Sequence, residues 1–264
     1  MTSTAERSLG DSILTRIRSE RLIQVGCIRQ PPLLDYWISG DQSVVASGLY
    51  ASLTSQLALQ ESIECKFKGL RFHEMVPGIE AGEVDIVLCS FPTDQRRRRV
   101  DFSAILHTIG LGAVVRNRPG APKSRSDFAN FSGRIALVNG EIGWEHAMRY
   151  LNLNDRPNDF IVGDDRLIGN VLSCLLQDET VDAAIADSLS CYQFAQQHGG
   201  SGCAFDVIDL EQPHDIGVMH RKGDAALSAW LDGCFSKARK HPQIAQEEGA
   251  ILAQYNKIIG RKLE

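Results

Sequence analysis

Apolar residues recur along the chain with alternating helix-like and strand-like spacing. Residues 48–60 carry Leu49, Leu53 and Leu57 at every fourth position, the spacing of one buried helix face. Residues 84–89 form a mostly apolar run, which is typical of a strand covered on both faces. The same criteria predict further helices at residues 10–21, 74–81, 140–151, 167–176, 189–197 and 225–259, and further strands at residues 22–28, 63–69, 134–138, 161–162 and 181–186.

The order of these elements predicts the fold class. Strands and helices alternate, so we expect an α/β fold with mostly parallel sheets flanked by helices. The order strand, helix, strand, helix, buried strand, helix occurs twice, which favours two similar lobes over one long sheet. We assign residues 1–115 to the first lobe, 116–214 to the second, and 215–264 to a return into the first lobe with C-terminal helices. Residues 116–126, rich in Pro, Gly, Ser and basic residues, mark one expected crossing, and residues 212–218 mark the other.

Composition argues against several classes of function. The 264-residue chain carries a formal net charge of −5, which disfavours a nucleic-acid partner because phosphate binding needs a basic surface. No apolar stretch approaches the roughly 20 residues that cross a bilayer. The seven cysteines include no Cys-x-x-Cys pair, so we expect no zinc site, no other metal and no cofactor. Free buried thiols, typical of a reducing compartment, explain these cysteines better than disulfides do.

The N-terminal 21 residues are polar and charged, without the apolar core or the small-residue cleavage site of a secretory signal. A cytoplasmic location therefore follows if this sequence is full length. An exported location follows if a signal has been removed.

Two neighbouring stretches carry motifs in a specific order. Residues 79–86 read IEAGEVDI, and residues 93–103 contain Thr93, Arg96 and the triplet Asp101-Phe102-Ser103. Together they resemble the helix, strand and loop at the core of the bacterial family 3 solute-binding proteins, the receptors of polar amino-acid ABC importers. Four further segments resemble motifs of the same family in the same order, so that the similarity extends over residues 10–260: residues 22–32, 131–135, 181–187 and 216–224.

The resemblance implies a two-lobed, type II periplasmic-binding-protein-like fold with a ligand cleft between the lobes. It implies that the chain captures a small polar ligand, zwitterionic or carboxylate-bearing, such as an amino acid. The implied partner is an ABC permease, the implied location is the periplasm, and the implied state is a monomer. No catalytic residue is expected.

Two charged residues are the main candidates for ligand binding. Arg96 occupies the family position for a carboxylate, which a guanidinium binds through two parallel N–H groups. It follows the strand at residues 84–89, at the sheet edge where ligands of α/β proteins bind. The alternative is that Arg96, the first of four successive arginines, belongs to a solvated face. Asp187 can pair with a ligand ammonium or cap the helix that begins near Ser188, and these two roles are compatible.

The turn at Gly140, Glu141 and Ile142 lies between a strand and a helix, where backbone N–H groups can bind a carboxylate. Glu141 either selects a cationic ligand or points to solvent. Phe72 matches an aromatic residue that stacks on ligands in the family, although a core aromatic explains it nearly as well. The remaining candidates are Ser90, Phe91 and Gln30.

Three departures from the family pattern suggest that the ligand differs from a standard amino acid. The turn that contains Ser90 and Phe91 is about one residue short, and Leu33 replaces an aromatic residue. The usual acidic residue near the first turn is missing, and Cys27, Gln30 or Asp35 can substitute for it.

Two other functions remain open. A dehydratase-like enzyme on the same scaffold could use Glu141, His73, His146 and Asp187 as acid–base groups. The third possibility is a ligand-sensing module, or a degenerate receptor that binds no ligand and serves in interaction or regulation.

Overall fold

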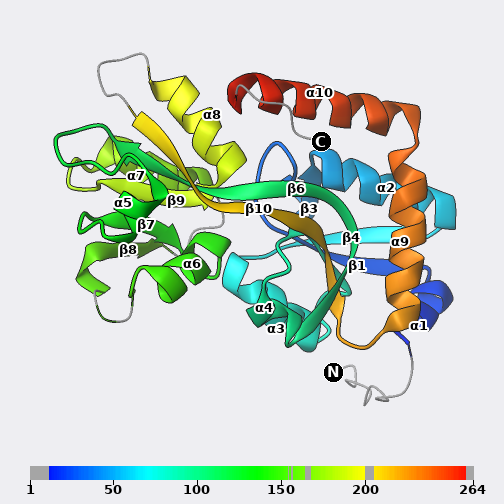
Figure 1. The fold of residues 1–264 in the computed structure, drawn as a ribbon. Helices are drawn as coiled ribbons and strands as arrows, with labels where there is room; N and C mark the ends of the chain where they lie inside the picture. Colours follow the sequence, from blue (N-terminus) through cyan, green and yellow to red (C-terminus); the bar gives the residue numbers. More distant parts are fainter. Residues whose placement is uncertain (1–11, 154, 156, 164–167, 200–204, 260–264) are drawn as a thin grey trace.

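The computed structural model describes residues 12–153, 155, 157–163, 168–199 and 205–259. These residues form a mixed α/β structure in which one eight-stranded sheet runs through the molecule (Figure 1). The strand order is β4-β1-β5-β10-β6-β9-β7-β8, and a hairpin of β2 and β3 stands apart from this sheet.

The first half of the chain supplies one end of the sheet. Its elements are α1 (Ile13–Glu20), β1 (Leu22–Cys27), β2 (Asp35–Ile38), β3 (Val44–Ser47), α2 (Leu49–Glu61), β4 (Glu64–Gly69), the 3-10 helix η1 (Phe72–Glu74), α3 (Met75–Glu80), β5 (Ile86–Ser90), α4 (Asp94–Arg97) and β6 (Val100–Arg116).

The second half supplies the other end and then returns. Its elements are α5 (Arg125–Ala129), β7 (Ile135–Val138), α6 (Ile142–Tyr150), the 3-10 helix η2 (Pro157–Asp159), β8 (Phe160–Gly163), α7 (Ile168–Gln177), β9 (Ala183–Asp187), α8 (Ser188–His198), β10 (Phe205–Arg221), α9 (Ala225–Arg239) and α10 (Pro242–Ile259).

Two groups of parallel strands define the two lobes. We name the part built on β4, β1 and β5 the first lobe, and the part built on β9, β7 and β8 the second lobe. Within each group the pairs β1–β4, β1–β5, β7–β8 and β7–β9 are all parallel. Helices α5 to α8 surround the second group, and α1, α2, α3 and α9 surround the first (Figure 1). The expected α/β fold with parallel strands in each lobe is confirmed.

Two long strands join the lobes. Strands β6 and β10 contain 17 residues each and pair in antiparallel fashion from Val100 opposite Arg221 to Arg116 opposite Phe205. At one end β10 pairs with β5 of the first lobe, and at the other end β6 pairs with β9 of the second. The two lobes therefore share one continuous sheet, which differs from the separate sheets that we expected. The register of β10 shifts at three places between Asp209 and Val218, in the middle of this passage.

One of the two predicted crossings between the lobes lies elsewhere in the structure. We expect one crossing at residues 116–126, but the chain has already reached the second lobe there. These residues begin at the last residue of β6, and Leu111–Val115 of that strand already pair with β9. Residues 212–218 lie within β10, in its irregular part. The numbered lobe boundaries stay a prediction.

The predicted helices and strands are present where hydrophobic spacing is regular. Leu49, Leu53 and Leu57 of α2 are all buried, and so is every residue of β5. The predicted tail forms α9 and α10, and α10 also reaches the second lobe, where Tyr255 hydrogen-bonds Ser188 of α8 (Oη to Oγ, 2.7 Å). None of the described helices is long and apolar enough to cross a membrane. The described cysteines are free thiols, and Cys203 lies outside the described residues.

Asp224 connects the start of α9 to the start of α1. Its carboxylate caps α9 by accepting from the Leu227 N–H (3.0 Å), and it accepts from the Ile13 N–H (2.9 Å) and the Ser12 hydroxyl (3.0 Å) at the start of α1. One side chain therefore satisfies the N-termini of two helices, which otherwise have unpaired N–H groups.

We expect Asp224→Ala to lower the free energy of unfolding by about 2 kcal/mol, because two helix starts lose their acceptor at once. Urea denaturation followed by circular dichroism measures this change. Glu179→Ala, which removes an exposed carboxylate, is the control and should change stability by less than about 0.5 kcal/mol. Equal stability of both variants would contradict the assigned role of Asp224.

Candidate functional site

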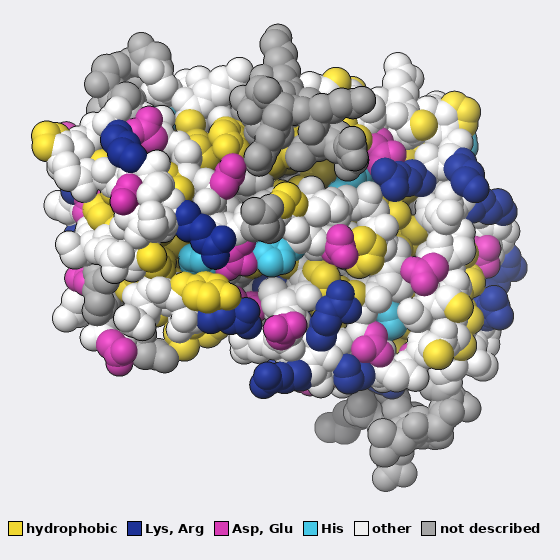
Figure 2. Space-filling model, in the orientation of Figure 1, with side chains coloured by type: hydrophobic (Ala, Val, Ile, Leu, Met, Phe, Trp, Pro, Cys, Tyr) yellow, Lys and Arg dark blue, Asp and Glu magenta, His cyan; other side chains and the backbone are white. Residues whose placement is uncertain are grey.

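Polar and charged side chains meet where the first lobe faces the second. Figure 2 shows histidine, acidic and basic side chains gathered in the middle of one face of the molecule. The nine residues that the sequence nominates for ligand binding lie on elements that border this junction: Gln30, Phe72, Ser90, Phe91 and Arg96 in the first lobe, and Gly140, Glu141, Ile142 and Asp187 in the second.

Arg96 is buried between the lobes, with 5% of its surface exposed. It lies on α4, which follows β5 and is capped by Thr93, whose hydroxyl accepts from the Arg96 N–H. Its guanidinium donates from Nη1 to the Phe91 carbonyl (3.1 Å) and from Nη2 to the Gly140 carbonyl (2.9 Å). Its Nε lies 2.9 Å from Oε1 of Glu145 on α6. The guanidinium therefore contacts acceptors from both lobes.

The other three arginines of the run behave as a solvated face. Arg97, Arg98 and Arg99 are exposed, and Arg99 forms an ion pair with Glu80 on the surface. The solvated-face alternative therefore holds for these three residues and not for Arg96.

The turn between β7 and α6 approaches the first lobe closely. Gly140 has a φ of +76°, and a Cβ at this position would lie 2.6 Å from the backbone of His73. Only glycine fits this contact, because any side chain would collide with backbone atoms. The absence of a side chain thus lets the Gly140 carbonyl reach Arg96.

Glu141 is buried, with 2% of its surface exposed, so the alternative that it points to solvent is wrong. It caps α6 through Oε2, which accepts from the Gly143 N–H, whereas Oε1 has no hydrogen-bond partner within the described part of the chain. Burial raises the pKa of this carboxyl to about 8. The N–H of Gly143 and the charge of Arg96 oppose the rise, and the nearby charge of Asp187 adds to it.

Asp187 is fully buried at the end of β9. It caps α8, as one of the two expected roles requires, by accepting from the N–H (2.9 Å) and the hydroxyl (2.7 Å) of Ser190. Burial raises the pKa of its carboxyl, and the hydrogen bonds from Ser190 partly offset the rise. The side chain of Gln30, from the first lobe, acts in the same direction as Ser190. Gln30 in turn accepts from the Cys89 thiol (3.6 Å).

The four remaining candidates occupy different positions. Phe72 lines a cavity of about 160 Å³ together with Arg96 and Gly140. Ser90 is buried and its hydroxyl faces Met75 of its own lobe (Oγ to Sδ, 3.6 Å). Phe91 contributes its carbonyl to Arg96, and Ile142 lines a second cavity.

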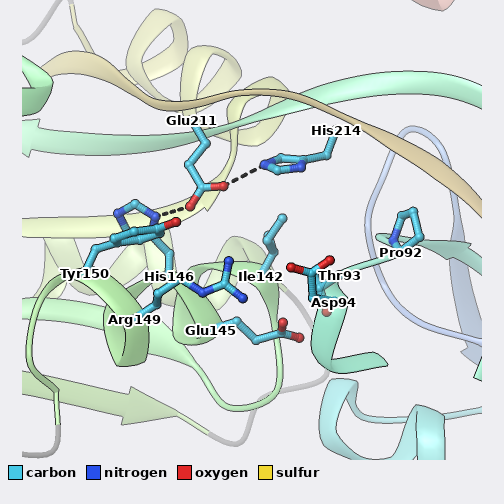
Figure 3. Close-up of a pocket in the computed structure, with 10 residues that line it drawn as sticks. All are labelled: Pro92, Thr93, Asp94, Ile142, Glu145, His146, Arg149, Tyr150, Glu211 and His214. Carbon is cyan, nitrogen blue, oxygen red and sulfur yellow. Dashed lines mark hydrogen bonds and ion pairs between the residues drawn. The ribbon is translucent and has the colours of Figure 1, made fainter. Parts of the chain in front are cut away.

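The second cavity has a volume of about 120 Å³, and its lining includes Glu145, the partner of Arg96 (Figure 3). Its lining includes a three-residue network in which Glu211 of β10 bonds His146 of α6 through one carboxylate oxygen and His214 through the other (2.6 Å). These two hydrogen bonds lower the pKa of the Glu211 carboxyl. Glu145 and Arg149 of α6 and Asp94 of α4 also line this cavity.

Sequence reasoning missed three residues of this junction. Glu145, Glu211 and His214 were not nominated, although Glu145 lies one helical turn after Glu141 and His214 falls in an expected crossing segment. Their importance depends on which surfaces meet when the lobes close, and hydrophobic spacing carries no information on that contact.

The charged groups of the junction are mainly acidic. No group of three or more His, Cys, Asp and Glu side chains in the described ranges is placed to hold a metal ion. Among the described residues, Arg96 is the one buried arginine. Glu145 pairs with it, its charge acts on Glu141, and Asp187 lies near Glu141. This acidic excess suits a ligand that brings positive charge.

Comparison with known proteins identifies relatives of the same architecture. Residues 27–255 match the sequence profile of the bacterial extracellular solute-binding proteins, family 3. An L-arginine-binding protein of Pseudomonas aeruginosa is 20% identical over 215 residues, which cover 76% of this chain and 77% of that protein.

Two solved structures show the same fold. A solute receptor for L-cysteine of Neisseria gonorrhoeae superposes with a TM-score of 0.73 at 16% identity, covering 93% of this chain and 95% of that one. The ancestral amino acid-binding protein AncCDT-1, a precursor of cyclohexadienyl dehydratase, superposes with a TM-score of 0.72 at 20% identity, covering 91% and 99%. The type II periplasmic-binding-protein fold and the resemblance noted in the sequence are confirmed, and the chain belongs to the bacterial extracellular solute-binding proteins, family 3.

Proposed function

We propose that the chain binds a small amino-acid-like solute between its lobes, with Arg96 as the anchor for the solute's carboxylate. The observation that carries this proposal is the position of the guanidinium, which is 5% exposed and meets acceptors from both lobes. A planar guanidinium at the carboxyl end of a buried strand is suited to two-pronged binding of a carboxylate.

Binding requires the lobes to separate. The two cavities at the junction have volumes of about 160 and 120 Å³, below the roughly 300–1,000 Å³ of typical ligand pockets. The contacts of Gly140 and Glu145 with Arg96 hold the lobes together in this arrangement. A solute that touches both lobes would then stabilise a closed state around itself, because those contacts exist only after closure.

The charge of the junction favours a cationic amino acid. Glu141 and Asp187 are buried carboxyl groups, and burial raises the pKa of each. Neighbouring cations therefore do not fully offset the cost of burying their negative charge. An ammonium or guanidinium of the solute would supply that compensation. The relative from Pseudomonas aeruginosa is named for L-arginine, which has such a group.

The family suggests the biological setting. We propose that the chain acts outside the cytoplasm as a monomer and delivers its solute to the permease of an ABC importer. In this role it releases the solute unchanged.

One observation supports a second candidate function, a dehydratase-like enzyme. A buried carboxyl with a pKa of about 8 can act as a general acid at neutral pH, and Glu141 has this property.

The two candidate functions differ in whether the solute is consumed. We expect L-arginine incubated with the protein to be recovered intact, and no loss of prephenate or arogenate by absorbance. Steady turnover that Glu141→Gln abolishes would replace the binding function with the enzymatic one.

Arg96→Ala should reduce affinity for the solute at least about 30-fold, since losing one partner of a buried charged hydrogen-bond pair costs roughly 2–5 kcal/mol. Isothermal titration with L-arginine, L-lysine, L-ornithine, L-histidine and L-cysteine measures the change. Arg98→Ala is the matched control from the same run, because Arg98 is exposed, and it should bind like the unaltered protein. Comparable affinity of the two variants would contradict the proposal.

Glu141→Gln should flatten the dependence of thermal stability on pH. The folded protein keeps the Glu141 carboxyl protonated up to about pH 8, whereas the unfolded chain releases this proton near 4.5, the ordinary pKa of a glutamate side chain. The stability that Glu141 contributes is therefore fully present below pH 4.5 and is lost as pH rises towards 8. The unfolding temperature should fall over this window in the unaltered protein and fall less in the variant, whose amide can still cap α6. Glu179→Gln is the control, and parallel curves for all three proteins would refute the assignment.

A further inference from the structure

One edge of Arg96 that can bind a carboxylate is already occupied. The Nε–H and Nη2–H groups project from the same side of a guanidinium, and a carboxylate can bind this side, like the Nη1 and Nη2 side, with both oxygens. In this chain, Oε1 of Glu145 lies 2.9 Å from Nε, and the Gly140 carbonyl accepts from Nη2 at 2.9 Å. Both acceptors come from the second lobe. The remaining contact, from Nη1 to Phe91, stays within the first lobe.

The Arg96–Glu145 pair is shielded from water, since the two side chains are 6% and 14% exposed. A shielded ion pair gains more from its geometry than a surface pair does, and breaking it leaves an unpaired charge. A solute carboxylate that binds the same edge must therefore replace the ion pair between Glu145 and Arg96. It must also lose its own hydration.

Glu145 has another partner within reach. Arg149 lies one turn further along α6, is exposed, and lines the same 120 Å³ cavity (Figure 3). Oppositely charged residues four positions apart on a helix can pair, with the acidic residue first in the favoured order. Asp94, Glu211 and His214 line the same cavity. Tyr150 is the main cause of the raised pKa of Arg149, and the charges of Asp94 and Glu211 add to the rise. The side chain of Glu145 thus has room and a cation to turn to when it leaves Arg96.

We infer that Glu145 is a built-in competitor for the solute's carboxylate, which latches the empty lobes together on Arg96 and is displaced towards Arg149 when the solute binds. This inference rests on the proposed function of Arg96. It adds that the empty protein is held closed by its own carboxylate. The apparent affinity is then the intrinsic affinity multiplied by the fraction of molecules in which the latch is open. A solute without a carboxylate cannot replace Glu145, so the latch also selects for carboxylate-bearing solutes.

Glu145→Gln removes the charge and keeps the size of the side chain. The variant should bind L-arginine about tenfold more tightly or better by isothermal titration, because the competing carboxylate is gone while Arg96 remains. Glu179→Gln is the matched control: it makes the same change at an exposed carboxylate that lines neither cavity. Its affinity should stay within about threefold of the unaltered protein. Unchanged or weaker binding by Glu145→Gln would overturn the inference.

The empty protein gives a second readout that needs no solute. Small-angle X-ray scattering without ligand should report a larger radius of gyration for Glu145→Gln than for the unaltered protein or Glu179→Gln. An identical radius would overturn the latch. The proposed function fails separately, if the unaltered protein and Glu145→Gln both bind none of the amino acids while the radius still increases in the variant.

Discussion

A guanidinium buried between two lobes must find acceptors on every side, and at Arg96 those acceptors come from both halves of the molecule. Phe91 supplies a carbonyl from the first lobe, and Gly140 and Glu145 supply a carbonyl and a carboxylate from the second. Burial without these acceptors would be costly, because an isolated charge loses its hydration. The contact between the lobes and the burial of Arg96 therefore depend on each other. The close approach in turn depends on Gly140, since a Cβ there would collide with the backbone of His73.

Under the proposed function, the two lobes share one guanidinium and also move apart. The sheet that joins them explains how both are possible. Strands β6 and β10 run from the first lobe to the second as one antiparallel pair, so the lobes are joined by a ribbon and not by a loose linker. The register of β10 shifts repeatedly between Asp209 and Val218, and irregular pairing of this kind bends a strand locally. Glu211 and His214 belong to the same irregular stretch, so the cavity lined by Glu145 is built partly from the ribbon itself.

Hydrophobic spacing predicted the elements whose surroundings are uniform along their length. Helix α2 buries one regular face, and β5 is buried throughout, so both were visible in the sequence. Strands β6 and β10 were missed because they pass from one lobe to the other and meet a different environment at each end, which breaks any regular alternation. The position of Arg96 followed from a motif spacing. The burial of Glu141 and the role of Glu145 did not, because each depends on which surfaces of the two lobes meet.

The charges at the junction constrain what the site can accept. Glu145 is matched to Arg96. Glu141 lies near both Arg96 and Asp187, and the carboxyl groups of Glu141 and Asp187 are left with raised pKa values. A solute that carries only a carboxylate would release Glu145 and leave the other two acids uncompensated. A solute that carries only a cation would compensate those acids and leave the latch shut. A molecule with a carboxylate at one end and a cation at the other meets both requirements, and under the proposed function this makes a cationic amino acid a better fit than either half alone.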